Sequence, residues 1–254
     1  MEKEIILKVK EKKEFSQLPD GLVEKALVAG KGDVKQARAI LRKYFGVFLT
    51  NRVLKPKSLD EGILKSHIST RNRDYLEIYK RIFDSEKIKT IVDLGCGVNG
   101  FSYKFIVDVF GGGVNYIGVE SVGQLVNLMN NYFRDRGFQR AYVFHKDLFD
   151  LDFVIDILKK LKGEEEKPRI VFLFNVIDAL EFFERNFSKK LISEVSEECE
   201  KIVLSFPVQS LSGKTKFKSK RYWILSFLEE RFKILDDFEL SGERFIVFTG
   251  KKEV

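Results

Sequence analysis

Hydrophobic and polar positions alternate regularly from residue 90 onward. Short apolar runs, typical of strands, are separated by longer segments in which apolar residues recur at every third or fourth position. We predict strands at residues 90–94, 115–120, 141–145, 169–175 and 201–206, and helices at residues 100–110, 122–136, 151–161, 179–196 and 219–230. Strands that alternate with helices build βαβ units, so a mostly parallel sheet is expected.

The chain ends on a different pattern. Two strand-like runs, residues 232–240 and 244–252, are separated only by Ser241-Gly242-Glu243, which is a hairpin signal. Five alternating units followed by an antiparallel hairpin are typical of Rossmann-type methyltransferases rather than dehydrogenases, whose last strand is parallel. The predicted fold class is therefore α/β, a Rossmann-like sheet of the S-adenosylmethionine-dependent methyltransferase kind that ends in an antiparallel hairpin.

The first 83 residues have the hydrophobic periodicity of helices. The only strand signal is the opening run at residues 5–9, and apolar residues between Leu22 and Leu41 recur at spacings of three and four. A turn is predicted at residues 30–33, with Asp33 as the N-cap of the next helix. A further helix is expected over residues 69–83. We predict a small helical domain at residues 1–83 and the sheet domain at residues 84–254.

Charge is distributed unevenly between these two parts. The net charge is +7, and residues 1–83 hold 19 Lys and Arg against 11 Asp and Glu, whereas the remainder holds 26 against 27. A segregated positive surplus favours a polyanionic partner such as RNA, because each cation placed on a phosphate releases counterions. Two cysteines exclude a disulfide framework, and the absence of a long apolar run or of a signal-peptide pattern predicts a cytoplasmic protein.

The sharpest motif is Val92-Asp93-Leu94-Gly95-Cys96-Gly97, at the end of a predicted buried strand. Gly95 and Gly97 allow backbone N–H groups to approach a ligand closely at the sheet edge where α/β proteins bind ligands. The pattern D-x-G-x-G, with Asp93 as its acid, differs from the dinucleotide fingerprint and from a phosphate-binding loop. We therefore expect a bound group that is uncharged or cationic.

Acidic residues also follow the next two predicted strands. Glu120 closes the second strand and is placed to bind ribose hydroxyls, and Asp147 follows the third. Asp147 could accept a hydrogen bond from an adenine amino group while Leu148 packs on the ring. Three such features at successive strand ends imply S-adenosylmethionine as the cofactor.

Several sequence motifs that the chain lacks restrict the kind of atom that could accept the methyl group. The turn after the fourth strand contains Asn175 and Asp178 but no Pro, unlike methyltransferases that act on exocyclic amines. Cys96 and Cys199 are poorly placed for covalent catalysis, and no spacing of His and Cys suggests a metal site. Acceptors that need little activation remain, such as a ring nitrogen with a free lone pair, which needs positioning rather than deprotonation. Asn175 and Asp178 are the candidates for positioning the base, and no catalytic residue is assigned beyond them.

Two segments carry clustered bases. The first is residues 67–73, where Ser69 or Thr70 is the expected N-cap of a helix and Arg71 could reach the methionine carboxylate of the cofactor. The second is the loop that begins at Ser205 and continues into a run of bases. This run looks like a phosphate-binding loop, and its members are Lys214, Lys216, Lys218, Lys220 and Arg221.

These motifs together resemble the aminoglycoside-resistance 16S ribosomal RNA guanine-N7 methyltransferases. The resemblance rests on H-x-S-T-R-x-R at residues 67–73, V-D-L-G-C-G-x-N at residues 92–99 and S-F-P-x-x-S-L-x-G at residues 205–213. It covers roughly residues 60–250. The chain departs from the family pattern in having Gly100 after Asn99 where Pro is usual, Glu120 where Asp is common, and Val208-Gln209 where Thr-Arg is usual.

The resemblance implies a helical domain that docks on ribosomal RNA and methyl transfer to N7 of a decoding-site guanine in the assembled small subunit. It also implies site residues. The cofactor residues would be His67, Thr70, Arg71, Asp93, Gly95, Gly97, Glu120, Asp147 and Leu148. The RNA-binding candidates rest instead on the clustered bases and on the loop after Ser205, and they are Arg73, Gln209, Lys214, Lys216, Lys218, Lys220 and Arg221.

Two other interpretations stay open. A small-molecule methyltransferase would explain the sheet and the cofactor motifs but not the basic helical domain. A cofactor-binding ribosome-assembly factor with little activity would fit the altered Val208-Gln209 motif. In each case we expect a monomer that binds no metal and no membrane.

Overall fold

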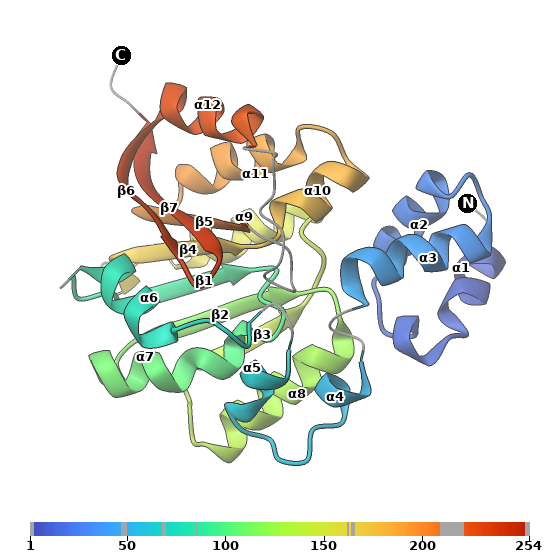
Figure 1. The fold of residues 1–254 in the computed structure, drawn as a ribbon, viewed down its shortest axis with the longest axis horizontal. Helices are drawn as coiled ribbons and strands as arrows, with labels where there is room; N and C mark the ends of the chain where they lie inside the picture. Colours follow the sequence, from blue (N-terminus) through green and yellow to red (C-terminus); the bar gives the residue numbers. More distant parts are fainter. Residues whose placement is uncertain are drawn as a thin grey trace.

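A seven-stranded sheet forms the centre of the larger part of the molecule (Figure 1). The computed structural model describes residues 3–46, 50–67, 70–84, 86–161, 163, 166–208 and 221–251. The strands are β1 (Thr90–Leu94), β2 (Asn115–Glu120), β3 (Ala141–His145), β4 (Arg169–Phe174), β5 (Lys201–Pro207), β6 (Phe232–Leu240) and β7 (Glu243–Lys251). Their order is β3-β2-β1-β4-β5-β7-β6.

The sheet is parallel from β3 to β5, and the final hairpin closes it. β1 pairs in parallel with β2 and β4, while β7 lies antiparallel between β5 and β6. The predicted strands are found within one residue of their expected ends. The predicted fold class, including its antiparallel hairpin, is confirmed.

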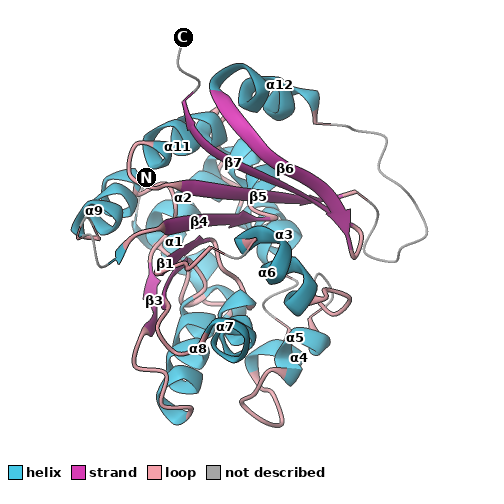
Figure 2. Cartoon of the chain, turned by 90° about the vertical axis from the view of Figure 1, so that its left-hand side faces the viewer, coloured by secondary structure: helices cyan, strands magenta, loops and turns pink. Residues whose placement is uncertain are grey.

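Helices cover both faces of the sheet (Figure 2). One face carries α6 (Tyr75–Phe83), α7 (Tyr103–Phe110) and α8 (Gly123–Asp135), and the other carries α9 (Leu151–Lys160), α10 (Ile177–Phe183), α11 (Phe187–Ser196) and α12 (Tyr222–Arg231). Side chains of β1 alternate between the two cores, because Ile91 packs on the first and its neighbour Val92 on the second. Both cores are apolar, which explains why the strands read as nearly continuous hydrophobic runs.

The N-terminal helices stand beside this body as a bundle (Figure 1). The bundle consists of α1 (Lys3–Lys10), the short 3₁₀ helix η1 (Lys13–Phe15), α2 (Asp20–Ala29) and α3 (Val34–Phe45). Asp33 caps α3 as predicted, since its Oδ1 accepts a hydrogen bond from the backbone N–H of Gln36 at 2.7 Å. Two short helices, α4 (Asn51–Leu54) and α5 (Gly62–Ser66), then lead to α6.

Three local expectations are wrong. The run at residues 5–9 is helical, because Ile6 and Val9 share one buried face of α1 and no strand in the described part of the chain lies beside them. The helix expected from residue 69 begins at Tyr75, where the Asp74 carboxylate caps it by accepting from the N–H of Glu77 at 3.1 Å. The single helix expected over residues 179–196 is divided into α10 and α11 at Asn186, whose φ is 64°.

Helix α6 packs on the sheet through aromatic rings. The ring of Tyr79 stacks on Phe172 of β4 at 6.2 Å, and Phe83 stacks on the same ring at 6.3 Å. The division of the chain at residue 83 stays a prediction, and α6 belongs by its packing to the layer that covers the sheet. No helix in the described part of the chain is long and apolar enough to cross a membrane.

Candidate functional site

A pocket opens at the carboxyl ends of β1, β2, β3 and β4, the sheet edge at which the sequence predicted a ligand. The predicted residues that line this pocket are Thr70, Gly95, Gly97, Glu120, Asp147, Leu148, Arg73 and Asn175. Asp93, His67, Arg71, Asp178 and Arg221 do not line it. The pocket therefore brings together most of the residues expected at the ends of the first three strands.

The glycine turn forms the floor of the pocket. Gly95 has φ +72° and Gly97 has φ +55°, which is backbone that favours glycine. A Cβ at Gly95 would lie only 2.8 Å from Cγ2 of Val176, at the start of α10. Position 95 therefore leaves no room for a side chain, because Val176 fills that space.

Glu120 lines the pocket and also holds the glycine turn. Its Oε2 accepts a hydrogen bond from the N–H of Gly97 at 2.8 Å, and its Oε1 accepts from the N–H of Val122 at 2.8 Å and from the hydroxyl of Ser121 at 3.2 Å. The residue is 6% exposed. Burial raises the pKa of Glu120, although the backbone N–H groups favour its charged form. The carboxylate thus presents buried acceptor atoms at the end of β2.

Asp93 supports the turn from behind rather than facing the pocket. Its Oδ2 accepts hydrogen bonds from Asn99 Nδ2 and from the Tyr116 hydroxyl, each at 2.7 Å. The side chain is fully buried, and this burial raises its pKa to about 6. The interpretation of Asp93 as a direct ligand residue is therefore corrected. The D-x-G-x-G pattern reflects a brace for the turn at this position.

Asp147 and Leu148 form the opposite wall. The Asp147 Oδ1 accepts hydrogen bonds from the N–H of Phe149 at 2.9 Å and of Asp150 at 3.2 Å, which fixes the carboxylate in the turn after β3. Burial raises the pKa of Asp147. Leu148 is 6% exposed, and its Cδ1 lies 3.5 Å from the position of a Cβ on Gly95. An acidic acceptor beside an apolar side chain suits a flat, aminated ring.

The N-terminal bundle supplies a wall that the sequence did not predict. Leu22, Tyr44 and Phe45 line the pocket from α2 and α3. The ring of Tyr44 lies 4.5 Å from that of Phe182 in α10, and an ion pair of 2.7 Å joins Lys25 to Glu184. In the sequence these residues are ordinary apolar and charged positions of a helix, and only their packing reveals their place at the pocket.

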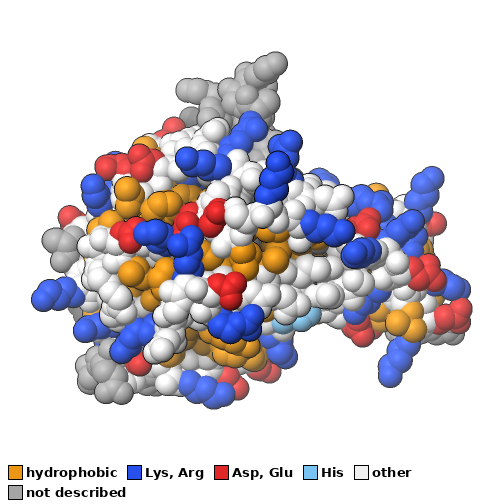
Figure 3. Space-filling view, turned by 90° about the horizontal axis from the view of Figure 1, so that it is seen from below, with side chains coloured by type: hydrophobic (Ala, Val, Ile, Leu, Met, Phe, Trp, Pro, Cys, Tyr) orange, Lys and Arg blue, Asp and Glu red, His pale blue; other side chains and the backbone are white. Residues whose placement is uncertain are grey.

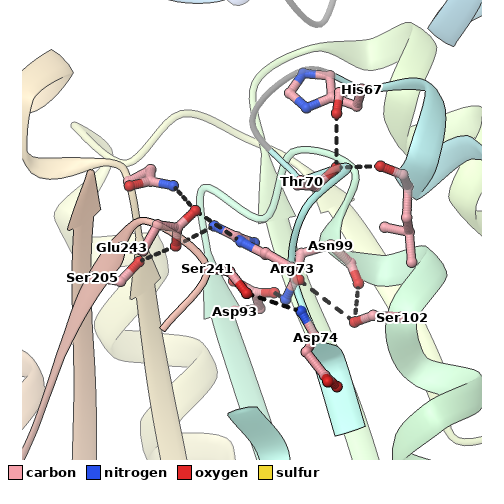
Figure 4. A network of polar contacts seen from close by, with 12 residues as sticks. His67, Thr70, Arg73, Asp74, Asp93, Asn99, Ser102, Ser205, Ser241 and Glu243 are labelled. Atoms are coloured by element: carbon pink, nitrogen blue, oxygen red, sulfur yellow. Dashed lines mark hydrogen bonds and ion pairs between the residues drawn. The ribbon is translucent and has the colours of Figure 1, made fainter. Parts of the chain in front are cut away.

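A buried polar network lies beside the pocket (Figure 4). Arg73 donates to the Glu243 carboxylate through Nε at 3.0 Å and through a terminal nitrogen at 2.9 Å, and the two side chains are 5% and 6% exposed. Asn175 Nδ2 donates to Oε1 of Glu243 at 2.9 Å, and the Ser205 hydroxyl donates to its Oε2 at 3.3 Å. Three distant segments of the chain thus meet at one carboxylate.

This network revises the role predicted for Arg73. Burial opposes the charge of Arg73, but Glu243 outweighs it and holds the Arg73 pKa above its usual value. Arg73 lines the pocket as one half of a buried ion pair, and it is not an exposed RNA contact. The sequence marks Glu243 only as a hairpin residue, and no sequence signal identifies it as part of the site.

The network also orients Asn175. Its φ is 58°, and its Nδ2 is taken by Glu243, so the amide oxygen is directed away from that carboxylate. This oxygen is buried and has no hydrogen-bond partner among the described residues. Asn175 therefore lines the pocket with a buried acceptor that the described residues leave unsatisfied, and its role in positioning the base stays a prediction.

The remaining predicted residues lie around the pocket. His67 is 1% exposed, and burial together with Arg73 lowers its pKa to about 4, so the ring is neutral at physiological pH. The Thr70 hydroxyl donates to the carbonyl of Leu64 at 2.7 Å and does not cap a helix. Arg71 is exposed. Ser69 lies outside the described residues.

Arg221 and Asp178 contact each other. Arg221 donates to the two carboxylate oxygens of Asp178 at 3.0 and 2.7 Å and to the carbonyl of Pro207 at 3.0 Å. Its side chain is 10% exposed. The ion pair ties α10 to the end of β5, and the base-positioning role expected of Asp178 and the RNA contact expected of Arg221 stay predictions. Gln209, Lys214, Lys216, Lys218 and Lys220 lie outside the described residues.

The described residues do not favour catalysis by a cysteine nucleophile or by a bound metal ion. Cys96 lies at the pocket, but burial raises the pKa of its thiol well above the usual value, and burial raises that of Cys199 to about 12. Both thiols are therefore protonated and unreactive near neutral pH. No group of three or more His, Cys, Asp and Glu side chains in the described part of the chain could hold a metal ion.

The lower face of the molecule carries Lys and Arg side chains on both the body and the bundle (Figure 3). Blue side chains extend around the N-terminal helices and across the sheet-containing part, with acidic side chains between them. The surplus charge seen in the sequence is therefore exposed at the surface, where an extended polyanion could contact it.

Neither a family model nor a curated protein matches the chain. Solved structures do match it. The 16S rRNA methylase RmtB is 18% identical with a TM-score of 0.72, over 98% of each chain. The 16S rRNA methyltransferase RmtF in complex with S-adenosyl-L-homocysteine is 19% identical with a TM-score of 0.71, over 98% of this chain and 99% of that one. An rRNA methylase from Escherichia coli is 16% identical with a TM-score of 0.69, over 98% and 99%. At these identities the likeness shows a shared fold that includes the N-terminal helices.

Proposed function

We propose that this protein is an S-adenosylmethionine-dependent methyltransferase that modifies small-subunit ribosomal RNA at N7 of a guanine near the decoding site. The observation that carries the proposal is the pocket in which the glycine turn, Glu120 and the pair Asp147–Leu148 meet at the carboxyl ends of the strands. The whole-chain likeness to 16S rRNA methylases supports it.

The residues present fit this cofactor. The glycine turn lines the pocket at Gly95 and Gly97, so a ligand there would lie against its backbone. Glu120 presents buried acceptor oxygens for a ribose, and Asp147 with Leu148 offers an acceptor and an apolar contact for an adenine. Thr70 and Arg73 lie at the pocket where the methionine end would bind, in place of the Arg71 that the sequence suggested. When bound, the cofactor supplies an activated methyl group on a positively charged sulfur.

The reaction at N7 requires positioning from the protein and no general base. N7 carries a lone pair in the ring plane and no proton, so no side chain has to remove one. His67 is neutral because its pKa is lowered to about 4, and it has no proton-transfer role in this scheme. Asn175 is the positioning residue, since its amide oxygen is held at the pocket as an acceptor for an N–H of the target base.

RNA docking is assigned to the N-terminal bundle and to the basic run at residues 214–221. The bundle carries part of the surplus, since residues 3–45 hold 11 Lys and Arg against 6 Asp and Glu. It also lines the pocket through Leu22, Tyr44 and Phe45. Its position next to the pocket allows one surface to hold the ribosomal RNA while the target base enters. We propose that the protein acts as a monomer in the cytoplasm, on the assembled subunit.

Labelled methyl transfer tests the proposal. The protein is incubated with methyl-labelled cofactor and with isolated small subunits, naked ribosomal RNA, or small-molecule acceptors. We expect label on small subunits, and cleavage of the RNA by borohydride and aniline, followed by primer extension, at one guanine. Label on a small molecule, or on an exocyclic amine, would replace the proposed acceptor. Cofactor binding without any transfer would favour an assembly factor.

A further inference from the structure

A second concave surface lies between α11 and α12, away from the pocket described above. Its lining is Lys189, Lys190, Ser193, Trp223, Ser226, Phe227, Glu230 and Arg231. We refer to it as the α11–α12 groove. Three cations and one anion line it, so the groove has a positive surplus. Neither the motifs of the sequence nor the proposed reaction uses any of these residues.

Two of the three cations of the groove, Lys189 and Arg231, lie over aromatic rings rather than beside carboxylates. The Lys189 ammonium lies 5.9 Å from the ring centre of Trp223 and 5.6 Å from that of Phe227, and the Arg231 guanidinium lies 5.7 Å from that of Phe227. None of the three cations forms an ion pair with another described residue. Cations elsewhere on the surface do, as Lys25 does with Glu184. The charge of the groove is therefore available to an external anion.

Trp223 is the second feature that points to a ligand. An indole is costly to expose, yet Trp223 is 37% exposed in the first turn of α12. Aromatic faces next to cations are the usual means of holding single-stranded nucleic acid, because a base stacks on the ring while its phosphate contacts the cation. We propose that the α11–α12 groove binds a single-stranded segment of RNA, with a base on Trp223 and phosphates on Lys189, Lys190 and Arg231.

The location supports RNA over other polyanions. Lys189 follows Phe187, whose ring packs 4.7 Å from that of Phe149 at the wall of the pocket. Trp223 follows Arg221, which is bonded to the carbonyl of Pro207 at the end of β5. The groove thus begins at the same sheet edge as the pocket. The inference rests on the proposed function in one respect, namely that an RNA substrate approaches this edge.

Trp223 is the only tryptophan of the chain, so its fluorescence reports on the groove alone. The full-length protein is titrated with a short oligoadenylate, and with inorganic polyphosphate as an anion that has no bases. We expect the oligoadenylate to quench the fluorescence, with an affinity that falls as salt rises, and polyphosphate to compete with it without quenching. Absence of quenching by the oligoadenylate would overturn the proposal, as would equal quenching by polyphosphate.

Variants measured with a fluorescein-labelled oligoadenylate sharpen the test. Trp223→Ala should weaken binding by about 5- to 100-fold, and Trp223→Phe, which keeps an aromatic face, by less. The pair Lys189→Gln and Lys190→Gln should reduce the salt slope by about 0.7 for each phosphate that is no longer neutralised. The matched control is Lys159→Gln with Lys160→Gln, an exposed pair at the far end of α9, which should leave the slope unchanged.

Equal slopes in the two lysine pairs would overturn the proposal. Its failure can be distinguished from that of the proposed function. If the wild-type protein methylates small subunits but shows no quenching, the groove assignment falls and the methyltransferase stands. If quenching and slopes follow expectation without any methyl transfer, the groove stands and the proposed reaction falls.

Discussion

The buried ion pair between Arg73 and Glu243 permits a sharp test of how the pocket is built. Replacing Glu243 by Gln removes the negative charge and keeps the size of the side chain. Arg73 then remains buried at 5% exposure beside a neutral amide. An arginine cannot lose its proton at any practical pH, so Arg73 stays charged although it is buried. We expect Glu243→Gln to be strongly destabilising.

The magnitude follows from the environment of the pair. Breaking a buried ion pair by removing one partner costs about 3–5 kcal/mol, because the other charge is left uncompensated. Replacing both partners by apolar residues, as in Arg73→Met with Glu243→Leu, removes both charges together. Two donors then lose their acceptor: the Asn175 amide, whose bond of 2.9 Å is lost at a cost of about 1–3 kcal/mol, and the Ser205 hydroxyl, whose contact of 3.3 Å is longer. The double variant should therefore be more stable than the single variant.

A second ion pair of the same type supplies the control. Arg81 donates to Asp236 through Nε at 2.7 Å and through a terminal nitrogen at 3.1 Å, but these side chains are 47% and 34% exposed. Asp236→Asn should cost about 0–1 kcal/mol, since solvent screens the freed arginine. Urea unfolding without ligand measures all variants. A loss for Glu243→Gln as small as that for Asp236→Asn would refute the reasoning.

Further predictions concern the cofactor, pH and the reaction. Glu120→Ala should weaken S-adenosylmethionine binding by about 1–3 kcal/mol by calorimetry, and unchanged affinity would remove the ribose assignment. The folded-state pKa of Asp93 is raised to about 6, so its stabilising contribution is present below pH 4 and is lost as pH rises through 6. Asp93→Asn should make the fall in stability between pH 4 and pH 8 smaller by about 3 kcal/mol than in the wild type, and an unchanged fall would contradict the assignment. The buried Glu120 and Asp147 carboxyls, whose pKa values are also raised, contribute the fall that remains. His67→Gln should stay active, with turnover flat from about pH 7 to pH 9, and a log-rate of unit slope there would indicate a general base.

Much of the fold could be predicted because it depends on local pattern. The buried strands are continuous apolar runs, and their ends follow from the turns beside them. The glycine turn is predictable for the same reason, since Gly95 and Gly97 lie in one short segment with positive φ. The wrong expectations lie where two local signals compete. Residues 5–9 suit a strand by composition, but Ile6 and Val9 pack as one helical face on α3, and tertiary packing decides.

Site residues that depend on distant segments could not be predicted in this way. The sequence assigns Arg73 to RNA because an arginine in a basic motif is usually exposed, and only the hairpin turn that brings Glu243 beside it makes it a buried partner. Tyr44 likewise reads as one more apolar position of α3, and its contact with Phe182 at 4.5 Å turns it into a wall of the pocket. Hydrophobic periodicity in the sequence predicts that a side chain is buried, but it does not predict which part of the protein packs against it. Under the proposed function the bundle would have two separable roles, a basic outer surface that docks on RNA and an inner surface that lines the pocket through Tyr44 and Phe45, so substitutions on one surface need not disturb the other.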